Sequence, residues 1–214
     1  MGVEVWAIVV AAGEGRRFGQ PKQFAVLGGR SVIEWSLEAS RSVARGVVAV
    51  VPESSLASSV IVKGADRVIV GGPTRASSVR RGLAAVPEHA DVVVVHDAAR
   101  PLASPELFRA VVEAVVAGAD AAIPGLAVVD TVKRVRNGCV VETLDRRELV
   151  AIQTPQAFRA AVLRRAHVGE PEATDDAALV EALGSSIVVV PGEYHNLKLT
   201  SPDDLATAER WSSR

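Results

Sequence analysis

Residues 5–10 read VWAIVV, and residues 11–15, which follow directly, read AAGEG. The first stretch is continuously apolar and rich in β-branched side chains, a pattern typical of a strand buried on both faces of a parallel sheet. The second stretch places glycines directly after that strand, where backbone N–H groups can line a turn and bind phosphate oxygens. Together the two stretches predict an α/β fold with a phosphate-binding loop after its first strand.

The same alternation continues along the chain, where short apolar runs follow stretches of helical periodicity. It predicts βαβ units, and therefore a Rossmann-like, mostly parallel sheet flanked by helices, in a single domain of residues 1–214. Further strands are expected at residues 47–51, 67–70, 91–96, 119–123, 187–190 and 197–199. Helices are expected at residues 31–43, 75–86, 104–116, 159–167 and 175–183, and a last helix begins at Ser201-Pro202.

A β-hairpin is expected where this alternation stops. Residues 131–144 place an Asn-Gly pair between two β-rich arms, which is a strong signal for a type I′ turn. The implied register pairs Lys133 with Glu142, and Val135 with Val140. A hairpin inserted in a βαβ chain cannot easily bury both faces on its own domain. We therefore expect residues 130–147 to form a projecting arm that packs on a second subunit.

Composition excludes several classes of protein. Apolar residues make up 49% of the 214 residues, which is enough for a large core, and the net charge of −1 argues against a general nucleic-acid binder. The single cysteine, Cys139, allows no internal disulfide, as in a reducing cytosol. No apolar run approaches the ~18 residues of a membrane span, so we expect a cytoplasmic protein with no membrane partner.

Two familiar phosphate-binding loops fit the opening stretch poorly. A dinucleotide-binding Gly-x-Gly-x-x-Gly needs glycine at position 18, but Phe18 stands there and Gly19 comes one residue late. A P-loop needs a Gly-Lys pair, whereas Lys22 follows Pro21. A dinucleotide-binding oxidoreductase therefore remains only as a remote alternative.

Three polar segments fall at the carboxyl ends of expected strands, where such sheets bind ligands. They are the loop of residues 11–24, the segment 71–75 and the segment 96–101. Arg17 and Lys22 place full positive charge in the first segment. Preplaced cations stabilise the negative charge that builds during displacement at phosphorus. The sequence therefore favours a phosphate-binding function at this edge, with a plain surface turn that carries solvated arginines as the alternative.

In order along the chain, a series of short motifs resembles the 2-C-methyl-D-erythritol 4-phosphate cytidylyltransferase family of sugar and polyol nucleotidyltransferases. The resemblance runs from about residue 5 to the last helix. The motifs are Ala11-Ala12-Gly13-x-Gly15-x-Arg17 with Pro21-Lys22-Gln23, Gly71-Gly72-x-x-Arg75-x-x-Ser78-Val79, His96-Asp97-Ala98-Ala99-Arg100-Pro101, Asp130-Thr131-Val132-Lys133, Leu144-Asp145-Arg146, Gln153-Thr154-Pro155-Gln156, Thr174-Asp175-Asp176 and Asn196-Leu197-Lys198.

The resemblance implies an Mg²⁺-dependent homodimer that transfers CMP from CTP to methylerythritol phosphate, in non-mevalonate isoprenoid biosynthesis. It implies that Arg17 and Lys22 stabilise the transition state. It also implies that CTP is bound by Ala11, Ala12, Gly13, Gly15, Gly72, Ser78 and Ala98. The implied polyol-binding residues are Asp97, Arg100, Thr154, Thr174 and Lys198, with Thr131 and Arg146 arriving from the partner's arm. Asp97 is also a candidate Mg²⁺ ligand, with the ion held mainly by the CTP phosphates.

Other interpretations stay open at several positions. Ribitol-5-phosphate cytidylyltransferase is the nearest alternative, although Arg146 and Ala99 favour the erythritol enzyme. Pro73 stands where some members of the family have a carboxylate, and Glu14 lies inside the anion-binding loop. We expect structural roles for a further set of polar residues: His96 as a packing residue, Asp175 and Asp176 at a helix N-terminus, and Arg80 and Arg81 on a solvated helix face.

Overall fold

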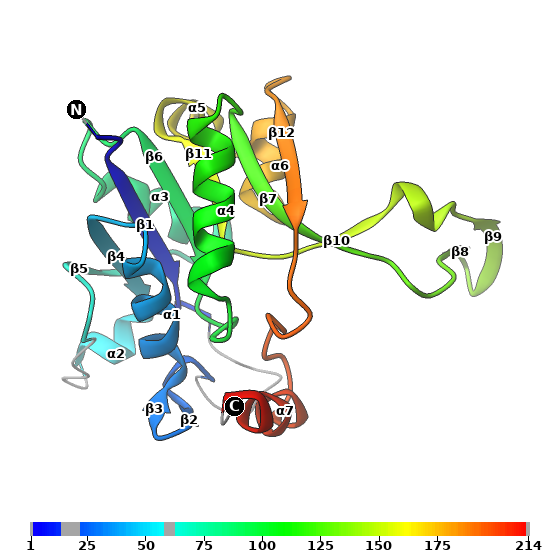
Figure 1. Ribbon diagram of the computed structural model, residues 1–214, viewed down its shortest axis with the longest axis horizontal. Helices are drawn as coiled ribbons and strands as arrows, with labels where there is room; N and C mark the ends of the chain where they lie inside the picture. The colour runs from blue at the N-terminus through cyan, green and yellow to red at the C-terminus, as the bar shows by residue number, and fades with distance from the viewer. Residues whose placement is uncertain (1, 14–21, 58–62, 213–214) are drawn as a thin grey trace.

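An eight-stranded mixed sheet forms the centre of the protein in the computed structural model, which describes residues 2–13, 22–57 and 63–212 (Figure 1). The strand order is β10-β7-β11-β6-β1-β4-β5, and β12 also pairs with β7. The strands are β1 (Val5–Val10), β4 (Gly46–Val51), β5 (Arg67–Val70), β6 (Val92–Asp97), β7 (Ala121–Ala127), β10 (Val150–Ile152), β11 (Gln156–Arg159) and β12 (Ile187–Pro191). The pairs β1–β4, β1–β6, β4–β5 and β12–β7 are parallel, which confirms the predicted mostly parallel, Rossmann-like α/β sheet.

Helices cover both faces of this sheet. One layer contains α1 (Val32–Arg41) and α4 (Pro105–Val116), and the other contains α3 (Arg75–Ala84), α5 (Ala160–Ala166) and α6 (Asp176–Glu181). Two short pieces, α2 (Glu53–Ala57) and a 3₁₀ turn η1 (Lys22–Phe24), and the ribbon β2 (Val26–Leu27) with β3 (Arg30–Ser31) lie outside these layers. Side chains alternate along β1, so Ala7 and Val9 join the first core, whereas Ile8 joins the second.

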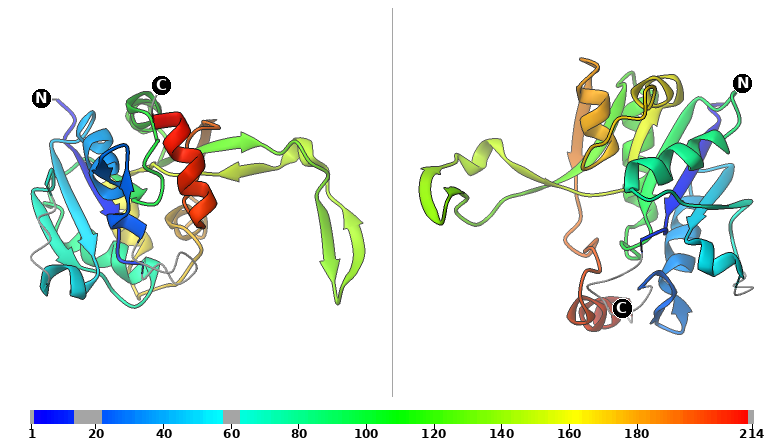
Figure 2. Two further views of the ribbon diagram at one scale, coloured as in Figure 1. Left: turned by 90° about the horizontal axis from the view of Figure 1, so that it is seen from below. Right: turned by 180° about the vertical axis from the view of Figure 1, so that it is seen from behind.

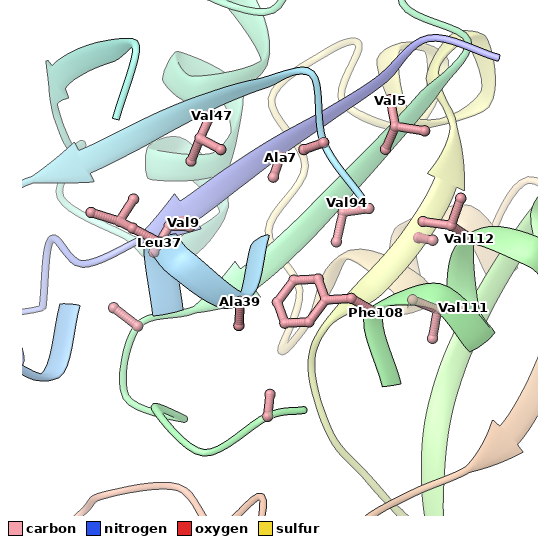
Figure 3. Close-up of a cluster of buried hydrophobic side chains, with 14 of the residues drawn as sticks. Val5, Ala7, Val9, Leu37, Ala39, Val47, Val94, Phe108, Val111 and Val112 are labelled. Carbon is pink, nitrogen blue, oxygen red and sulfur yellow. The ribbon is translucent and has the colours of Figure 1, made fainter. Parts of the chain in front are cut away.

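The first core is built around Phe108, which is fully buried between α4 and the sheet (Figure 3). Leu37 of α1 and Val94 of β6 belong to the same cluster. A third, smaller cluster holds α7 (Pro202–Ser212) against the β2–β3 ribbon through Leu27, Leu199 and Ala208. It keeps the segment before α7 close to the carboxyl edge of the sheet.

Sequence analysis missed the strands β10 and β11 of the central sheet and the two-residue strands β2 and β3, and it predicted one strand that does not form. The antiparallel strands β10 and β11 are only three and four residues long, too short for periodicity to show. Residues 197–199 form no strand. Instead, the backbone N–H of Leu199 donates to the carbonyl of Ala99 over 2.7 Å, which ties this segment to the loop after β6.

A two-stranded arm projects from the sheet (Figures 1 and 2), as predicted for residues 130–147. It consists of β8 (Lys133–Arg136) and β9 (Cys139–Thr143), and every residue of both strands is exposed. Asn137 and Gly138 both have positive φ, 50° and 77°, as a type I′ turn requires. A 3₁₀ turn, η2 (Arg146–Glu148), follows on the way back to the sheet.

One of the two predicted cross-strand pairs of the arm is confirmed and the other is wrong. Val135 lies opposite Val140, but a bulge between Arg134 and Val135 places Arg134 opposite Glu142. The predicted pairing of Lys133 with Glu142 is therefore wrong. The bulge has a clear benefit, because it lets Arg134 form an ion pair with Glu142 over 2.5 Å.

Within the described residues, none of the helices combines the length and apolar character that crossing a membrane requires.

Candidate active site

A cavity of about 590 Å³ opens at the carboxyl ends of β1 and β6. The three segments that the sequence placed at this edge all contribute to its wall. The lining residues are Val10, Ala11, Ala12, Gly13, Lys22, Gln23, Gly72, Pro73, Thr74, Arg75, Ser78, Asp97, Ala98, Ala99, Lys198 and Thr200. Of the residues predicted to bind CTP, Ala11, Ala12, Gly13, Gly72, Ser78 and Ala98 therefore surround one cavity. Gly15 and Arg17 lie outside the described residues.

One wall of the cavity is the N-terminus of α3. Thr74 caps this helix by accepting a hydrogen bond from the N–H of Ser77 over 3.1 Å. Ser78 accepts from the N–H of Gly72 over 3.1 Å and donates to the carbonyl of Thr74 over 2.9 Å. A side chain at position 71 would collide with Ala12, so glycine permits the close approach of the two loops. The helix end brings positive dipole charge to the cavity, which favours an anionic ligand.

Asp97, the last residue of β6, lies between the cationic side chains of Arg75 and Lys198. Its Oδ1 accepts from Nε of Arg75 over 3.0 Å, and its Oδ2 accepts from Nζ of Lys198 over 2.7 Å. Burial opposes ionisation of Asp97, but the charges of Arg75 and Lys198 outweigh it and hold the pKa of the carboxyl well below its usual range. The backbone N–H of Asp97 donates to Oγ1 of Thr154 over 3.0 Å, which fixes the end of β6.

Arg75 continues this network away from the cavity. Its Nη1 donates to Oδ2 of Asp176 over 2.7 Å, and Oδ1 of Asp176 lies 3.1 Å from Nε2 of His167. Burial disfavours the charged guanidinium, but Asp97 and Asp176 more than compensate and raise the pKa of Arg75 above its ordinary value. Sequence analysis assigned no role to Arg75, although the residue belongs to one of the family motifs. The sequence feature that could have pointed to Arg75 is a cation at the first position of a helix, where a carboxylate is usually preferred.

His96 has the packing role that was predicted for it. Its ring is fully buried, 5.0 Å from the ring of Phe108, and its nitrogens contact Oγ1 of Thr154 (3.2 Å) and the carbonyl of Arg100 (3.1 Å). Burial lowers the pKa of His96 to about 4, so the ring is neutral at physiological pH. It supports the loop after β6.

Lys22 also lines the cavity, close to the segment that carries Lys198. Nζ of Lys22 donates to the carbonyl of Leu199 over 2.7 Å, and the residue begins the 3₁₀ turn η1. Lys22 and Lys198 thus bring two positive charges to one cavity that also holds a helix N-terminus. This arrangement can bind a polyanion and stabilise the charge that develops when a phosphorus–oxygen bond breaks.

Five of the predicted polyol-binding residues do not line the described part of the cavity. Arg100 donates to the carbonyls of Asn196 (2.7 Å) and Ile152 (3.4 Å), so it braces the loop that carries Lys198. Thr154 is buried under the end of β6, and Thr174 is exposed on the segment before α6. The other two, Thr131 and Arg146, lie in the segments that flank β8 and β9 of the projecting arm, and neither lines this chain's own cavity.

The structure corrects the expectation for Arg80 and confirms the helix-end position of Asp175 and Asp176. The side chain of Arg80 is only 17% exposed, because it donates to the carbonyl of Pro171 over 2.9 Å and pairs with Glu172 over 3.2 Å. It therefore fastens the segment before α6 to α3 and does not lie on a solvated face. Asp175 caps α6 as expected, accepting from the N–H of Ala178 over 2.9 Å. The neighbouring Asp176 lies in the first turn of α6, as expected, but its carboxylate is also buried against Arg75 and His167, which the sequence did not predict.

The cavity offers poor ligands for a resident metal ion. Among the described lining residues, Asp97 supplies the carboxylate, and both of its oxygens accept hydrogen bonds from cations. Across the part of the chain that the structure describes, no three histidine, cysteine, aspartate or glutamate side chains gather closely enough to hold a metal. A divalent ion in this cavity would therefore depend on ligand oxygens, as Mg²⁺ commonly does with phosphates.

Comparison with known proteins identifies close relatives. A family model described as 2-C-methyl-D-erythritol 4-phosphate cytidylyltransferase matches residues 5–213. A protein of that name from Frankia casuarinae is 47% identical over 98% of this chain and 82% of its own length. Its namesake from Rubrobacter xylanophilus is 44% identical over 95% of this chain and 92% of its own length. A bifunctional enzyme IspD/IspF from Anaeromyxobacter dehalogenans is 45% identical over 97% of this chain, but the chain spans only 56% of that relative.

Solved structures resemble the fold over its whole length. The crystal structure of 4-diphosphocytidyl-2C-methyl-D-erythritol synthase from Anaerococcus prevotii has a TM-score of 0.86 and 31% identity, with all of both chains covered. That of 2-C-methyl-D-erythritol 4-phosphate cytidylyltransferase from Thermus thermophilus has a TM-score of 0.84 and 35% identity, again with all of both chains covered.

Proposed function

The chain belongs to the 2-C-methyl-D-erythritol 4-phosphate cytidylyltransferase family of the non-mevalonate isoprenoid pathway, and we propose that its cavity joins CTP to that polyol phosphate. An oxygen of the polyol's phosphate attacks the α-phosphorus of CTP, and the bond from that phosphorus to the bridging oxygen of pyrophosphate breaks. The products are 4-diphosphocytidyl-2-C-methyl-D-erythritol and pyrophosphate. The observation that carries this proposal is the convergence of the Ala11–Gly13 backbone, the α3 N-terminus and Lys22 on one cavity.

The chemistry of the nucleophile suits this site. A phosphate monoester has a second pKa of about 6, so it is already an anion at neutral pH and needs no general base. His96, the nearest imidazole, is buried and occupied by Thr154 and Arg100, which agrees with a reaction that asks for no base. Catalysis then depends on positioning the two reactants and on stabilising negative charge.

The proposed roles of the described cavity residues rest on their places in its wall. The backbone of residues 11–13, Gly72, Ser78 and Ala98 would surround the nucleotide, and Lys22 would stabilise the charge on the α-phosphoryl oxygens and the leaving pyrophosphate. Gly15 and Arg17 lie outside the described residues, and their proposed roles beside the nucleotide and the α-phosphate rest on the resemblance of their motif to that of the family. Asp97 and Lys198 form the polyol side, where the carboxylate can accept a hydrogen bond from a hydroxyl group and the ammonium can bind the phosphate.

Mg²⁺ enters this proposal as a companion of CTP. Both Asp97 oxygens are engaged by Arg75 and Lys198, so the triphosphate oxygens supply the ligands for the ion. When bound, the ion neutralises part of the triphosphate charge.

The working enzyme is proposed to be a homodimer in the cytoplasm. The exposed arm of one subunit would bring Thr131 and Arg146 to the polyol side of the other, where they would add to the phosphate contact that Lys198 offers. The single cysteine leaves the chain without an internal disulfide, which suits a reducing compartment.

One assay tests the activity and its specificity together. Pyrophosphate release is measured with CTP and Mg²⁺, with 2-C-methyl-D-erythritol 4-phosphate and ribitol 5-phosphate offered in parallel. We expect release with the erythritol substrate. Release with ribitol 5-phosphate alone would identify the related polyol enzyme, and tight NAD binding without release from either would contradict nucleotidyl transfer.

A further inference from the structure

A line of charged and polar groups, exposed at Lys198, partly buried at Arg75 and buried at Asp97, Asp176 and His167, leads from the cavity to the helix layer of α3, α5 and α6. It begins at Lys198 and Asp97, passes through Arg75, and ends at Asp176 and His167, with successive contacts of 2.7, 3.0, 2.7 and 3.1 Å. The inner end lies in the cavity wall, whereas Asp176 and His167 do not belong to that wall. The line joins four separate elements of the fold: the segment before α7, the end of β6, the start of α3, and the α5–α6 connection.

We propose that Asp176 and His167 are positioning residues, which act through Arg75 to fix the Asp97 carboxylate beside Lys198. The inference rests on the proposed function, because it gives Asp97 a place at the polyol phosphate. Neither Asp176 nor His167 touches the cavity, so neither is a catalytic residue.

Burial of Asp176 and His167 costs free energy unless their polar atoms have partners, and Arg75 is the charged partner of Asp176. The side chains of Asp176 and His167 are only 1% and 4% exposed. A carboxylate so far from water must be paired, and its partners here are one guanidinium N–H and one imidazole nitrogen. Because an ionised carboxylate only accepts hydrogen bonds, Nε2 of His167 donates to it. This donation holds Asp176 in the orientation that meets Arg75.

Helix capping does not explain Asp176. The adjacent Asp175 already fills that role for α6. Both oxygens of Asp176 face Arg75 and His167, which come from elements packed on the same side of the sheet.

The geometry of Arg75 transmits the effect to the cavity. The planar guanidinium presents Nε to Asp97 and Nη1 to Asp176, so the two carboxylates fix it from two directions. Without Asp176, the guanidinium can rotate to bind both oxygens of Asp97. The Arg75 guanidinium would then compete with Lys198 for Oδ2 of Asp97, and the Lys198 ammonium group would lose its position beside that oxygen. Asp176 also holds the segment that carries Thr174 against α3.

The test replaces Asp176 by asparagine, a change that keeps the size and removes the charge. We expect Asp176→Asn to lower kcat/KM for the polyol phosphate by roughly 10- to 100-fold, as misplacement of reacting groups does, while KM for CTP changes less than about twofold. In an Asp97→Asn background, the same change should cost less than about another twofold, because its effect passes through Asp97.

His167 is tested with a conservative pair. His167→Gln retains an N–H donor near the Nε2 position, so it should keep activity within about threefold of wild type, whereas His167→Leu should lose about tenfold. A second readout needs no substrate: the ¹⁵N–¹H NMR signal of the Arg75 Nε–H. It should be sharp and slow to exchange in the wild type and in His167→Gln, and broadened or lost in Asp176→Asn.

The matched control is Asp66→Asn. Asp66 also pairs with an arginine, Arg41, and accepts from the backbone N–H of Val47, but it lies before β5, away from the cavity. This variant should lower thermal stability and leave kcat and both KM values unchanged. Wild-type kinetics in Asp176→Asn, or losses that multiply in the double variant, would overturn the positioning role. A wild-type protein that releases no pyrophosphate would refute the proposed function instead, and the Arg75 signal would still decide this inference.

Discussion

Nζ of Lys198 lies 2.7 Å from Oδ2 of Asp97, although the two residues are 101 positions apart in the chain. The contact exists because Leu199 is tied by its backbone to Ala99, in the loop after β6. Two distant motifs thereby become one side of the cavity.

Removal of the Lys198 charge should weaken binding of the polyol phosphate. In Lys198→Met, the apolar stem is retained but the ammonium is lost, so we expect KM for the polyol phosphate to rise about tenfold or more, with little change in KM for CTP. Steady-state pyrophosphate release with each substrate varied in turn measures this. An unchanged KM for the polyol phosphate would show that this substrate does not bind at Lys198.

Removal of either cation at the α-phosphate should affect turnover more than binding. We expect Lys22→Ala and Arg17→Ala each to lower kcat by about 100-fold or more, because a preplaced charge stabilises the transition state more than the ground state. CTP affinity, measured by calorimetry, should fall only modestly. Arg16→Ala is the control, and near-normal turnover in either main variant would refute the assigned role.

Stability should depend on pH through Asp204. Burial opposes ionisation of this residue, but hydrogen bonds from Thr200 and Ser201 lower its pKa from 3.8 to about 2. A carboxyl whose folded-state pKa is depressed stabilises the fold above its unfolded pKa, and that stabilisation is lost as pH falls from about 4 towards 2. Asp204→Asn should therefore lower Tm at pH 7. The difference in Tm from wild type should shrink through this window, and a constant difference down to pH 2 would contradict the assignment.

The core around Phe108 should be sensitive to truncation. Phe108→Ala removes a fully buried ring that packs on His96, so we expect the free energy of unfolding to fall by about 3–5 kcal/mol. Urea denaturation measures this change. Val116→Ala on the same helix is the control, because Val116 is 52% exposed and its truncation should cost far less.

The arm should determine the oligomeric state. Val135 and Val140 form an exposed cross-strand pair, which we expect to be covered by a second subunit. Light scattering at micromolar concentration should detect a dimer for the wild type, and a Val135→Ser/Val140→Ser double variant should shift it towards monomer. A monodisperse wild-type monomer would contradict the arm's proposed role.

Local sequence predicted those parts of the fold that depend on long apolar runs and strong turn signals. The strands β1, β4, β5 and β6 were found to within one residue at each end, and the Asn137-Gly138 turn was found with its conformation. The bulge at Arg134 could not be foreseen, because the alternating pattern of the two arms contains no local signal for a change of register. The strands β10 and β11 were missed because three or four residues show no reliable period.

The sequence predicted which segments form the site, but it did not predict which of their side chains pair with one another. The glycine loop, Gly72 and Asp97 all follow expected strands, and the topology of parallel sheets brings such strand ends together. The pairing of Arg75 with Asp176 joins residues 101 positions apart, and no local pattern marks it. Asp176 was therefore interpreted from its neighbours in sequence as a residue of a helix end, although its partner comes from another helix.

The complete exposure of β8 and β9 has a further consequence, for the dynamics of the arm. A two-stranded hairpin that packs on nothing else is only marginally stable, so in a single chain the arm should open locally far more often than the sheet unfolds. Its backbone amides should then exchange with deuterium early, while those of β1 exchange late. If a second subunit covers the arm, deuterium exchange of the arm amides should slow as the protein concentration rises, and the amides that slow would identify the residues that become covered.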